Sequence, residues 1–127
     1  MRKGKNMPAI SVVMPVYNTK EYVGKAIESI LNQTFGDFEF LIIDNGSTDG
    51  SGDVIARYAQ TDSRIRVIHN EKNVFIAEAR NRALEQVQGE YLNLIDSDDW
   101  VLPDMLETMY GRAKEHDAQY VVAGYFM

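Results

Sequence analysis

The sequence predicts an open, mostly parallel α/β sheet with helices on both faces. Two observations support this prediction: short apolar runs alternate with amphipathic stretches along the chain, and the runs are predominantly apolar instead of alternating between apolar and polar residues. Strands that are buried on both faces have this continuous pattern, and parallel strands need helical crossovers between them. Right-handed crossovers then give a doubly wound sheet, in which ligands bind beyond the carboxyl ends of the strands.

Four strands and four helices are expected in alternation. The run at 10–16 is rich in β-branched residues and predicts the first strand. Further strands are expected at 38–43, 65–68 and 91–95. Apolar residues at helical spacing follow each strand and predict the buried faces of four helices. Pro103 is expected as the first residue of the last helix. In chain order, the four faces are Val23, Ala26, Ile27, Ile30 and Leu31; Val54, Ile55, Tyr58 and Ala59; Phe75, Ile76, Ala79, Ala83, Leu84 and Val87; and Met105, Leu106, Met109 and Ala113.

The length of 127 residues is that of one domain. We divide it into a flexible tail at 1–9 and a single domain at 10–127. The apolar run at 120–127 predicts a buried strand without a closing turn, so we expect a domain that is incomplete at its C-terminus and a chain able to form homo-oligomers. A formal charge of −6 argues against nucleic-acid partners. The sequence has no cysteine and no membrane-length apolar run, which favours a cytoplasmic protein.

A first polar cluster follows the strand at 10–16. Pro15 has no backbone N–H and indicates that the strand is ending. Tyr17 and Asn18 come next and are expected at the rim of the sheet. Tyr17 can stack on a nucleobase, an interaction worth roughly 1–3 kcal/mol in nucleic-acid sites. It can equally close the edge of the core, and the pattern alone leaves both interpretations open.

A second polar cluster lies at 44–50 and contains residues that favour turns and helix caps. Ser47 or Thr48 is placed to cap the second helix. Asp44 is the first charged residue after the apolar strand, so we expect it at the rim. There its carboxylate can accept the N–H of a nucleobase edge or simply belong to the turn.

A third polar cluster, at 96–99, follows the fourth strand and contains Asp96, Asp98 and Asp99. Residues two apart in an extended segment project to the same side, so Asp96 and Asp98 can face one point. Two carboxylates about 5 Å apart repel by roughly 3 kcal/mol at an effective dielectric constant of 20. A divalent cation reverses this sign, and oxygen ligands suit Mg²⁺ or Mn²⁺. The alternative is a polar loop that starts the next helix, but the position after a buried strand favours the metal.

Three further charged or titratable residues have less specific patterns. Arg80 lies beside the buried positions Ala79 and Ala83, where its guanidinium can reach a phosphate or remain solvated. His69 and His116 have no recognisable partner pattern and are interpreted as structural.

The segments 13–18, 44–49, 79–81 and 96–99 together resemble, in order and spacing, the motifs of the family 2 glycosyltransferases, which have the GT-A fold. The resemblance implies a nucleotide-sugar site made of Pro15, Tyr17, Asn18, Asp44, Arg80 and Asp96. In such a site Tyr17 and Asp44 would contact the nucleobase, and Asp96 would approach the ribose or the sugar. Asp98 would hold the metal on the diphosphate, and Asp99 would contact the sugar or shape the loop.

The same resemblance implies an activity. The expected reaction is metal-dependent transfer of a sugar from a nucleoside diphosphate, expected to be UDP, to a hydroxyl of a glycan or lipid-linked acceptor, with inversion. Polysaccharide biosynthesis, with peripheral attachment at the inner membrane face, is the expected setting. The general base and the acceptor surface belong to a second half that this sequence lacks, so we expect the chain to bind the donor only. Asn45, Val74, Phe75 and Ala83 depart from the commonest family pattern.

Three other functions fit the sequence less well. A dinucleotide-binding dehydrogenase needs a glycine-rich turn after the first strand, where Pro15 to Asn18 contain no glycine. A receiver-like module that binds Mg²⁺ needs acids at the same place. A sugar-phosphate nucleotidyltransferase would show a glycine-rich phosphate loop with a basic residue there.

Overall fold

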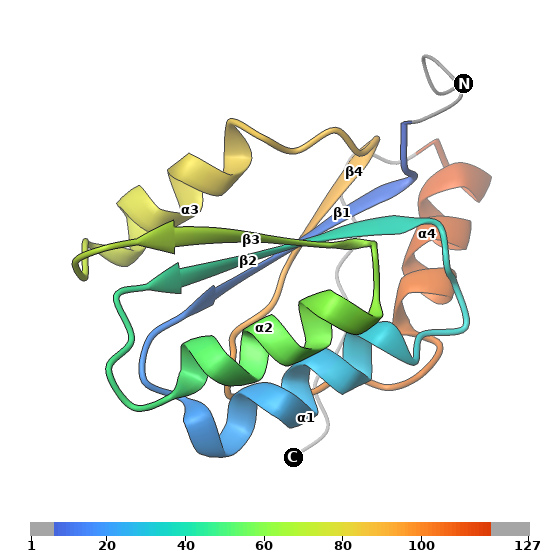
Figure 1. Ribbon diagram of the computed structural model, residues 1–127. Helices are drawn as coiled ribbons and strands as arrows, with labels where there is room; N and C mark the ends of the chain where they lie inside the picture. Colours follow the sequence, from blue (N-terminus) through green and yellow to red (C-terminus); the bar gives the residue numbers. More distant parts are fainter. Residues whose placement is uncertain (1–6, 118–127) are drawn as a thin grey trace.

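The computed structural model describes residues 7–117, which form a four-stranded parallel sheet with helices on both faces (Figure 1). The elements in chain order are β1 (Ile10–Val16), α1 (Lys20–Leu31), β2 (Phe38–Asn45), α2 (Ser51–Thr61), β3 (Ile65–Asn70), α3 (Ile76–Leu84), β4 (Tyr91–Leu94) and α4 (Met105–Glu115). The strand order is β3-β2-β1-β4, and every pair is parallel. The predicted fold class is therefore confirmed. The strand expected at 120–127 and most of the tail at 1–9 lie outside the described residues.

The main core lies between the sheet and three helices. α1, α2 and α4 pack on one face of the sheet, and α3 lies on the other (Figure 1). Alternate residues of the strands serve the two faces: Val12 and Met14 belong to the larger core, while Val13 packs under α3. The expected burial of both faces is correct for β1 and β2, whose residues are all buried.

The expected apolar stripe of α3 is largely wrong. Phe75 is 88% exposed and Ile76 is 53% exposed, and Leu84 is also exposed. Only the two alanines of the stripe, Ala79 and Ala83, are buried. The helix rests on β1 and β2 through these small side chains, and Phe75, Ile76 and Leu84 stay exposed. Val87, which follows the helix, packs partly against the same core.

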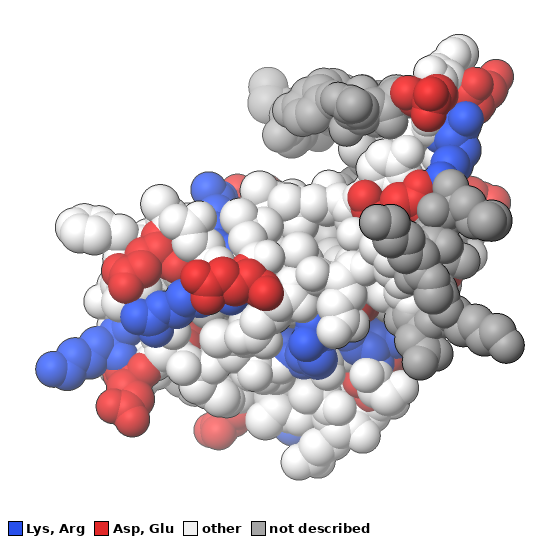
Figure 2. Space-filling view, turned by 90° about the horizontal axis from the view of Figure 1, so that it is seen from above, with Lys and Arg blue, Asp and Glu red and all other residues white. Residues whose placement is uncertain are grey.

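β4 also departs from the prediction of a strand buried on both faces. Leu92 and Leu94 are 47% and 48% exposed. They pair in register with Ser11 and Val13, so they belong to the face that carries α3. α3 packs mainly against β1 and β2. Figure 2 looks onto this side of the molecule and shows a broad uncharged area between its charged side chains.

Four element boundaries differ from the sequence prediction, and one of them is the end of β4, which lies at Leu94 instead of Ile95. β2 and β3 each continue two residues beyond their apolar runs, so Asp44 is part of a strand instead of following it. α4 starts at Met105 and not at Pro103. The carbonyl of Pro103 instead accepts a hydrogen bond from the Thr34 N–H at 2.8 Å. Tyr110, outside the predicted stripe of this helix, packs against the core.

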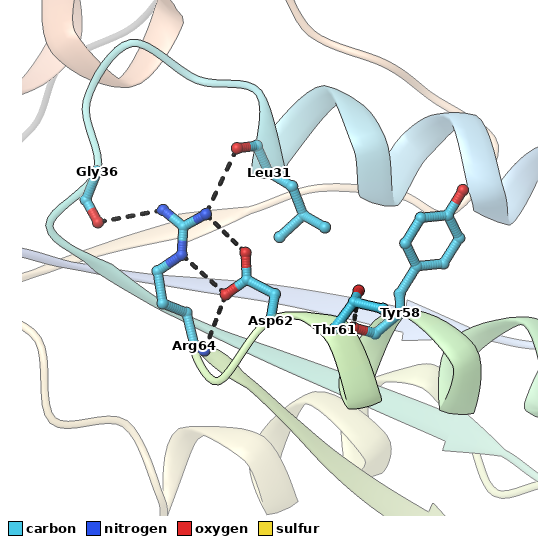
Figure 3. A network of polar contacts seen from close by, with 6 residues as sticks. All are labelled: Leu31, Gly36, Tyr58, Thr61, Asp62 and Arg64. Atoms are coloured by element: carbon cyan, nitrogen blue, oxygen red, sulfur yellow. Dashed lines mark hydrogen bonds and ion pairs between the residues drawn. The ribbon is translucent and has the colours of Figure 1, made fainter.

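An arginine joins two connections at the amino end of the sheet (Figure 3). The Nε of Arg64 lies 3.0 Å from Oδ1 of Asp62, and one of its terminal nitrogens lies 2.7 Å from Oδ2. The same guanidinium donates to the carbonyl of Leu31, the last residue of α1, and to that of Gly36 in the α1–β2 connection. It also lies 4.2 Å from the centre of the Phe38 ring. Because two carboxylate oxygens and two carbonyls share one guanidinium, this group fixes the entry into β2 and β3.

Among residues 7–117, no helix is both long and apolar enough to cross a membrane.

Candidate functional site

The polar clusters meet at the carboxyl edge of the sheet, as the fold predicts. The loops after β1 and β2 lead side by side into α1 and α2 (Figure 1). The backbone register aligns Val16 with Asp44, and Asp44 with His69, across three neighbouring strands. Parallel strands carry their ligand sites at this edge.

The first two loops are held together by hydrogen bonds. The Asn18 N–H donates to Oγ of Ser47 at 3.1 Å, and the Thr48 N–H donates to Oδ1 of Asn18 at 2.8 Å. Asn18 has a φ of 50°, a left-handed conformation that asparagine tolerates better than most residues. The Lys20 N–H donates to Asp49 at 3.1 Å. Asn18 therefore connects the two loops through its backbone N–H and its side chain, and its amide oxygen already accepts a hydrogen bond from Thr48.

The predicted cap of α2 is wrong. Its N-cap position is Gly50, with a φ of 97°, and no side chain caps it there. Ser47 is bonded to Asn18 instead. Asp49 accepts the N–H and the hydroxyl of Ser51, and this hydroxyl hydrogen bond is the main reason that the pKa of Asp49 lies below its usual value.

Asp44 is nearly enclosed at the end of β2. It is 7% exposed, and its Oδ1 accepts the Ser47 N–H at 3.1 Å. Its Oδ2 lies against Gly52, where a Cβ would come within 2.8 Å of it. The Nδ1 of His69 lies 3.6 Å from the same Oδ2. The sequence placed Asp44 at the rim, and the structure places it there as a buried carboxylate with one oxygen still available.

Asn45 organises the connection between β3 and α3. Its Nδ2 donates to Oδ1 of Asn73 and to the carbonyl of Val74, both at 2.8 Å. Its Oδ1 accepts from Asn70 at 3.0 Å and from the Val74 N–H at 3.1 Å. An aspartate, which the family pattern favours here, has no N–H for the first two bonds. The asparagine and the altered sequence at 73–75 therefore fit each other.

Three acidic side chains gather after β4. One carboxylate oxygen from each of Asp96, Asp98 and Asp99 lies within 4.8 Å of the others, and all three residues are exposed. Partial desolvation raises the pKa of Asp99, and the neighbouring Asp98 and Asp96 carboxylates raise it further. Between them, Ser97 is buried and its Oγ accepts a hydrogen bond from Thr19 at 2.8 Å. This bond joins the acidic loop to the loop after β1.

Arg80 of α3 approaches the acidic cluster from the other face of the sheet. One of its terminal nitrogens lies 3.6 Å from Oδ1 of Asp96. Its Nε is buried and has no hydrogen-bond partner within residues 7–117. The structure thus brings the Arg80 guanidinium next to the acidic cluster, and its contact with a phosphate stays a prediction.

The remaining predicted nucleotide residues belong to β1, to the loop that follows it and to β2. Tyr17 is 46% exposed just beyond the end of β1. Pro15 is buried within β1 and pairs in register with Ile43, so its ring is not presented at the rim. The site thus has two groups of residues, an acidic one with Arg80 and a rim group with Tyr17 and Asp44, joined through the bond between Thr19 and Ser97.

Sequence reasoning missed three contributors. Thr19 and Ser97 connect the loops, and His69 stands beside Asp44. The expected strand at 65–68 stopped one residue before His69. The hydrogen bond between Thr19 and Ser97 could not be predicted from a local sequence pattern, because the two residues lie 78 positions apart.

This open parallel sheet, with an acidic cluster and an arginine at its carboxyl edge, defines a GT-A-fold protein. Residues 11–127 match the sequence profile of Glycosyl transferase family 2. The chain belongs to this family.

Individual relatives agree with the assignment. The chain is 41% identical over 117 residues to the glycosyltransferase GlyG of Streptococcus pneumoniae. This alignment covers 92% of this chain and 39% of GlyG. The structure of S. aureus TarS 1-349 in complex with UDP-GlcNAc superimposes with a TM-score of 0.81 and 29% identity, over 86% of this chain and 32% of TarS.

A more distant structure is similar over a smaller part of the chain. The mannosyltransferase PcManGT of Pyrobaculum calidifontis, in complex with GDP-Man and Mn²⁺, has a TM-score of 0.69 and 26% identity, over 74% of this chain and 28% of that one. The chain spans less than half the length of the curated relatives that it matches.

Proposed function

We propose that this chain is the donor-binding part of a glycosyltransferase that transfers a sugar from a UDP-sugar to an acceptor hydroxyl with the help of Mg²⁺ or Mn²⁺. The observation that carries the proposal is the acidic cluster at the carboxyl edge of a parallel sheet, with its three carboxylates within 4.8 Å and Arg80 beside it. This is where a doubly wound sheet binds its ligand.

The side chains in the cluster fit a divalent cation. Three carboxylates offer hard oxygen ligands, and the raised pKa of Asp99 reflects desolvation together with the repulsion that a cation would relieve. Asp98 and Asp99, with Asp96, would hold the ion. When bound, a divalent ion supplies Lewis-acid stabilisation of the negative charge on the leaving diphosphate.

The remaining residues would bind and orient the donor. The guanidinium of Arg80, whose side chain is 36% exposed, offers N–H donors to a phosphate or ribose oxygen. The buried carboxylate of Asp44 offers one free oxygen to a base N–H, and the exposed ring of Tyr17 offers a stacking surface. Asn18 would contribute by fixing the loop geometry around the base.

Uracil is the base that we propose. The UDP-GlcNAc complex of TarS supports this choice, because TarS has the higher TM-score and the higher identity of the two ligand-bound structures. The GDP-Man complex of PcManGT makes guanine the alternative, and its Mn²⁺ supports the metal.

The acceptor side of the reaction is a wider proposal. We propose a glycan or lipid-linked acceptor, polysaccharide biosynthesis at the cytoplasmic face of the membrane, and inversion at the transferred carbon. The general base and the acceptor surface would then come from the part of the relatives' length that this chain does not span.

Calorimetric titration tests the donor site. UDP, GDP, dTDP and CDP are titrated into the chain, first with Mn²⁺ and then with a chelator. We expect UDP to bind most tightly and only with the metal. Failure of every nucleotide to bind a folded chain would contradict the proposal. Tighter binding of GDP than of UDP would make guanine, and not uracil, the base that the site recognises.

A further inference from the structure

A histidine stands beside Asp44 at the end of the sheet, outside the motifs that the sequence shares with the family. We propose that His69 is a second base-contacting residue, whose imidazole N–H donates to a uracil carbonyl next to the N3–H that Asp44 accepts. This inference rests on the proposed function, since it adds a base-recognition partner to the same site.

The backbone places the two side chains next to each other. Asp44 and His69 are register partners on the neighbouring parallel strands β2 and β3. The imidazole Nδ1 lies 3.6 Å from the carboxylate Oδ2. This distance exceeds that of a hydrogen bond, so the carboxylate oxygen and the imidazole both keep their capacity to bind a ligand.

The surroundings of Asp44 restrict how a ligand can approach its carboxylate. Its side chain is 10% exposed, whereas the side chain of His69 is 66% exposed. The Ser47 N–H donates to Oδ1 of Asp44, and Gly52 of α2 lies against Oδ2. A ligand N–H that reaches Oδ2 therefore brings its adjacent atoms beside the imidazole.

The chemistry of this pair matches the edge of uracil. The N3–H of uracil is a donor with a carbonyl on each side, so a carboxylate and a neighbouring N–H donor can bind N3–H and one carbonyl together. Cytosine has an unprotonated N3, whose lone pair would face the carboxylate. The buried Asp44 carboxylate would then have no donor from the base, which disfavours binding of cytosine. Within residues 7–117, His69 is the only cationic or potentially cationic side chain that pairs with Asp44.

A competing explanation is that His69 only supports Asp44. In that case the imidazole would hold the carboxylate in place without touching the base. Removal of His69 would then weaken all uracil nucleotides equally. An experiment on the proposal must therefore change the protein donor and the ligand carbonyl separately.

Binding of UDP, 2-thio-UDP and 4-thio-UDP with Mn²⁺, measured by calorimetry, makes this separation. The proteins are the chain itself, His69→Phe, His69→Gln and the control His116→Phe, which replaces the other histidine, exposed at the end of α4. Sulfur is a poor acceptor, so the unmodified chain should prefer UDP to one thio analogue by roughly tenfold. His69→Phe should lose this preference, His69→Gln should keep part of it, and His116→Phe should keep all of it.

Each other result has a definite meaning. A thio preference that persists in His69→Phe, or an equal loss for all three nucleotides, overturns the role of His69 and leaves the proposed function intact. Absence of UDP binding to the folded, unmodified chain overturns both. Circular dichroism verifies that each variant is folded, and His69→Gln completes the same comparison if His69→Phe does not fold.

Discussion

The guanidinium of Arg80 lies 3.6 Å from the carboxylate of Asp96, although the two residues lie on opposite sides of the β4 strand in sequence and come from different elements. This contact is the point at which α3 meets the acidic cluster. It links the helix that covers the smaller core to the loop that we propose as the metal site.

The first prediction concerns Arg80. Arg80→Gln removes the cation beside Asp96 and should weaken Mn²⁺–UDP binding by roughly tenfold, since charge-assisted hydrogen bonds to phosphate are among the stronger ones. Calorimetry measures the affinity. Arg112→Gln, at an exposed position of α4, is the matched control and should bind as the unmodified chain does. Equal affinities for the two variants would remove Arg80 from the site.

The second prediction concerns Asn45. Asn45→Asp keeps the shape of the side chain but removes the two N–H donors that hold Asn73 and Val74. We expect a loss of about 1–3 kcal/mol in the free energy of unfolding, because the two partly buried acceptors lose their donors and a buried carboxylate at position 45 then faces them. Urea denaturation measures the change. Asn32→Asp, at an exposed position after α1, should have a much smaller effect. An unchanged midpoint in Asn45→Asp would show that the loop does not depend on these bonds.

The third prediction compares two glycines. Gly46 has a φ of 77°, and a Cβ there would lie 2.6 Å from the backbone nitrogen of Asn73. Gly46→Ala should therefore destabilise the fold by roughly 1–3 kcal/mol. Gly111 lies within α4 and has nothing within 4 Å of its Cβ position. Gly111→Ala should stabilise the chain by up to about 1 kcal/mol. Thermal melts of both variants check the signs, and the same sign for both would contradict the prediction.

The fourth prediction is a pH dependence. The hydrogen bond from Arg64 is the main reason that the pKa of Asp62 lies below its usual value. A lowered pKa means that this stabilisation is complete above the unfolded-state pKa and is lost as the pH falls through the folded-state pKa. Arg64→Gln should cost about 1 kcal/mol at pH 7, because the pair is partly exposed.

The difference between the two proteins should then shrink in acid. Urea denaturation at several pH values, from neutral to below the unfolded-state pKa of an aspartate, measures it. A part carried by the contact with the Phe38 ring should persist at every pH. A difference that grows as the pH falls would have the wrong sign for this account.

The parts of the fold that depend on local sequence could be predicted. The continuous apolar run of β1 gave its bounds, Ile10–Val16, correctly. In α3 the helical spacing was present, but spacing alone does not reveal which apolar residues meet the sheet. Contact with β1 and β2 through Ala79 and Ala83 decides this, and it leaves Phe75 exposed.

The site was predictable where its residues cluster in sequence. Asp96 and Asp98 follow one strand and come close together as expected, and Asp99 joins them. His69 could not be placed beside Asp44 without the register between β2 and β3, which is a relationship between distant segments. Pro15 was assigned to the site by resemblance; it is buried within β1, and its part in nucleotide binding stays a prediction.

Manganese-dependent UDP binding by Asp98→Asn is the measurement that tests the central claim most directly. Asp104→Asn is the control, because Asp104 is exposed before α4 and makes no side-chain capping bond. We expect the unmodified chain and Asp104→Asn to bind UDP with Mn²⁺ and to lose binding with chelator. In Asp98→Asn the dissociation constant should rise by roughly tenfold or more, since a metal ligand has been removed. UDP binding that is equally tight in chelator, or unchanged in Asp98→Asn, would contradict the assignment of a metal-dependent donor site.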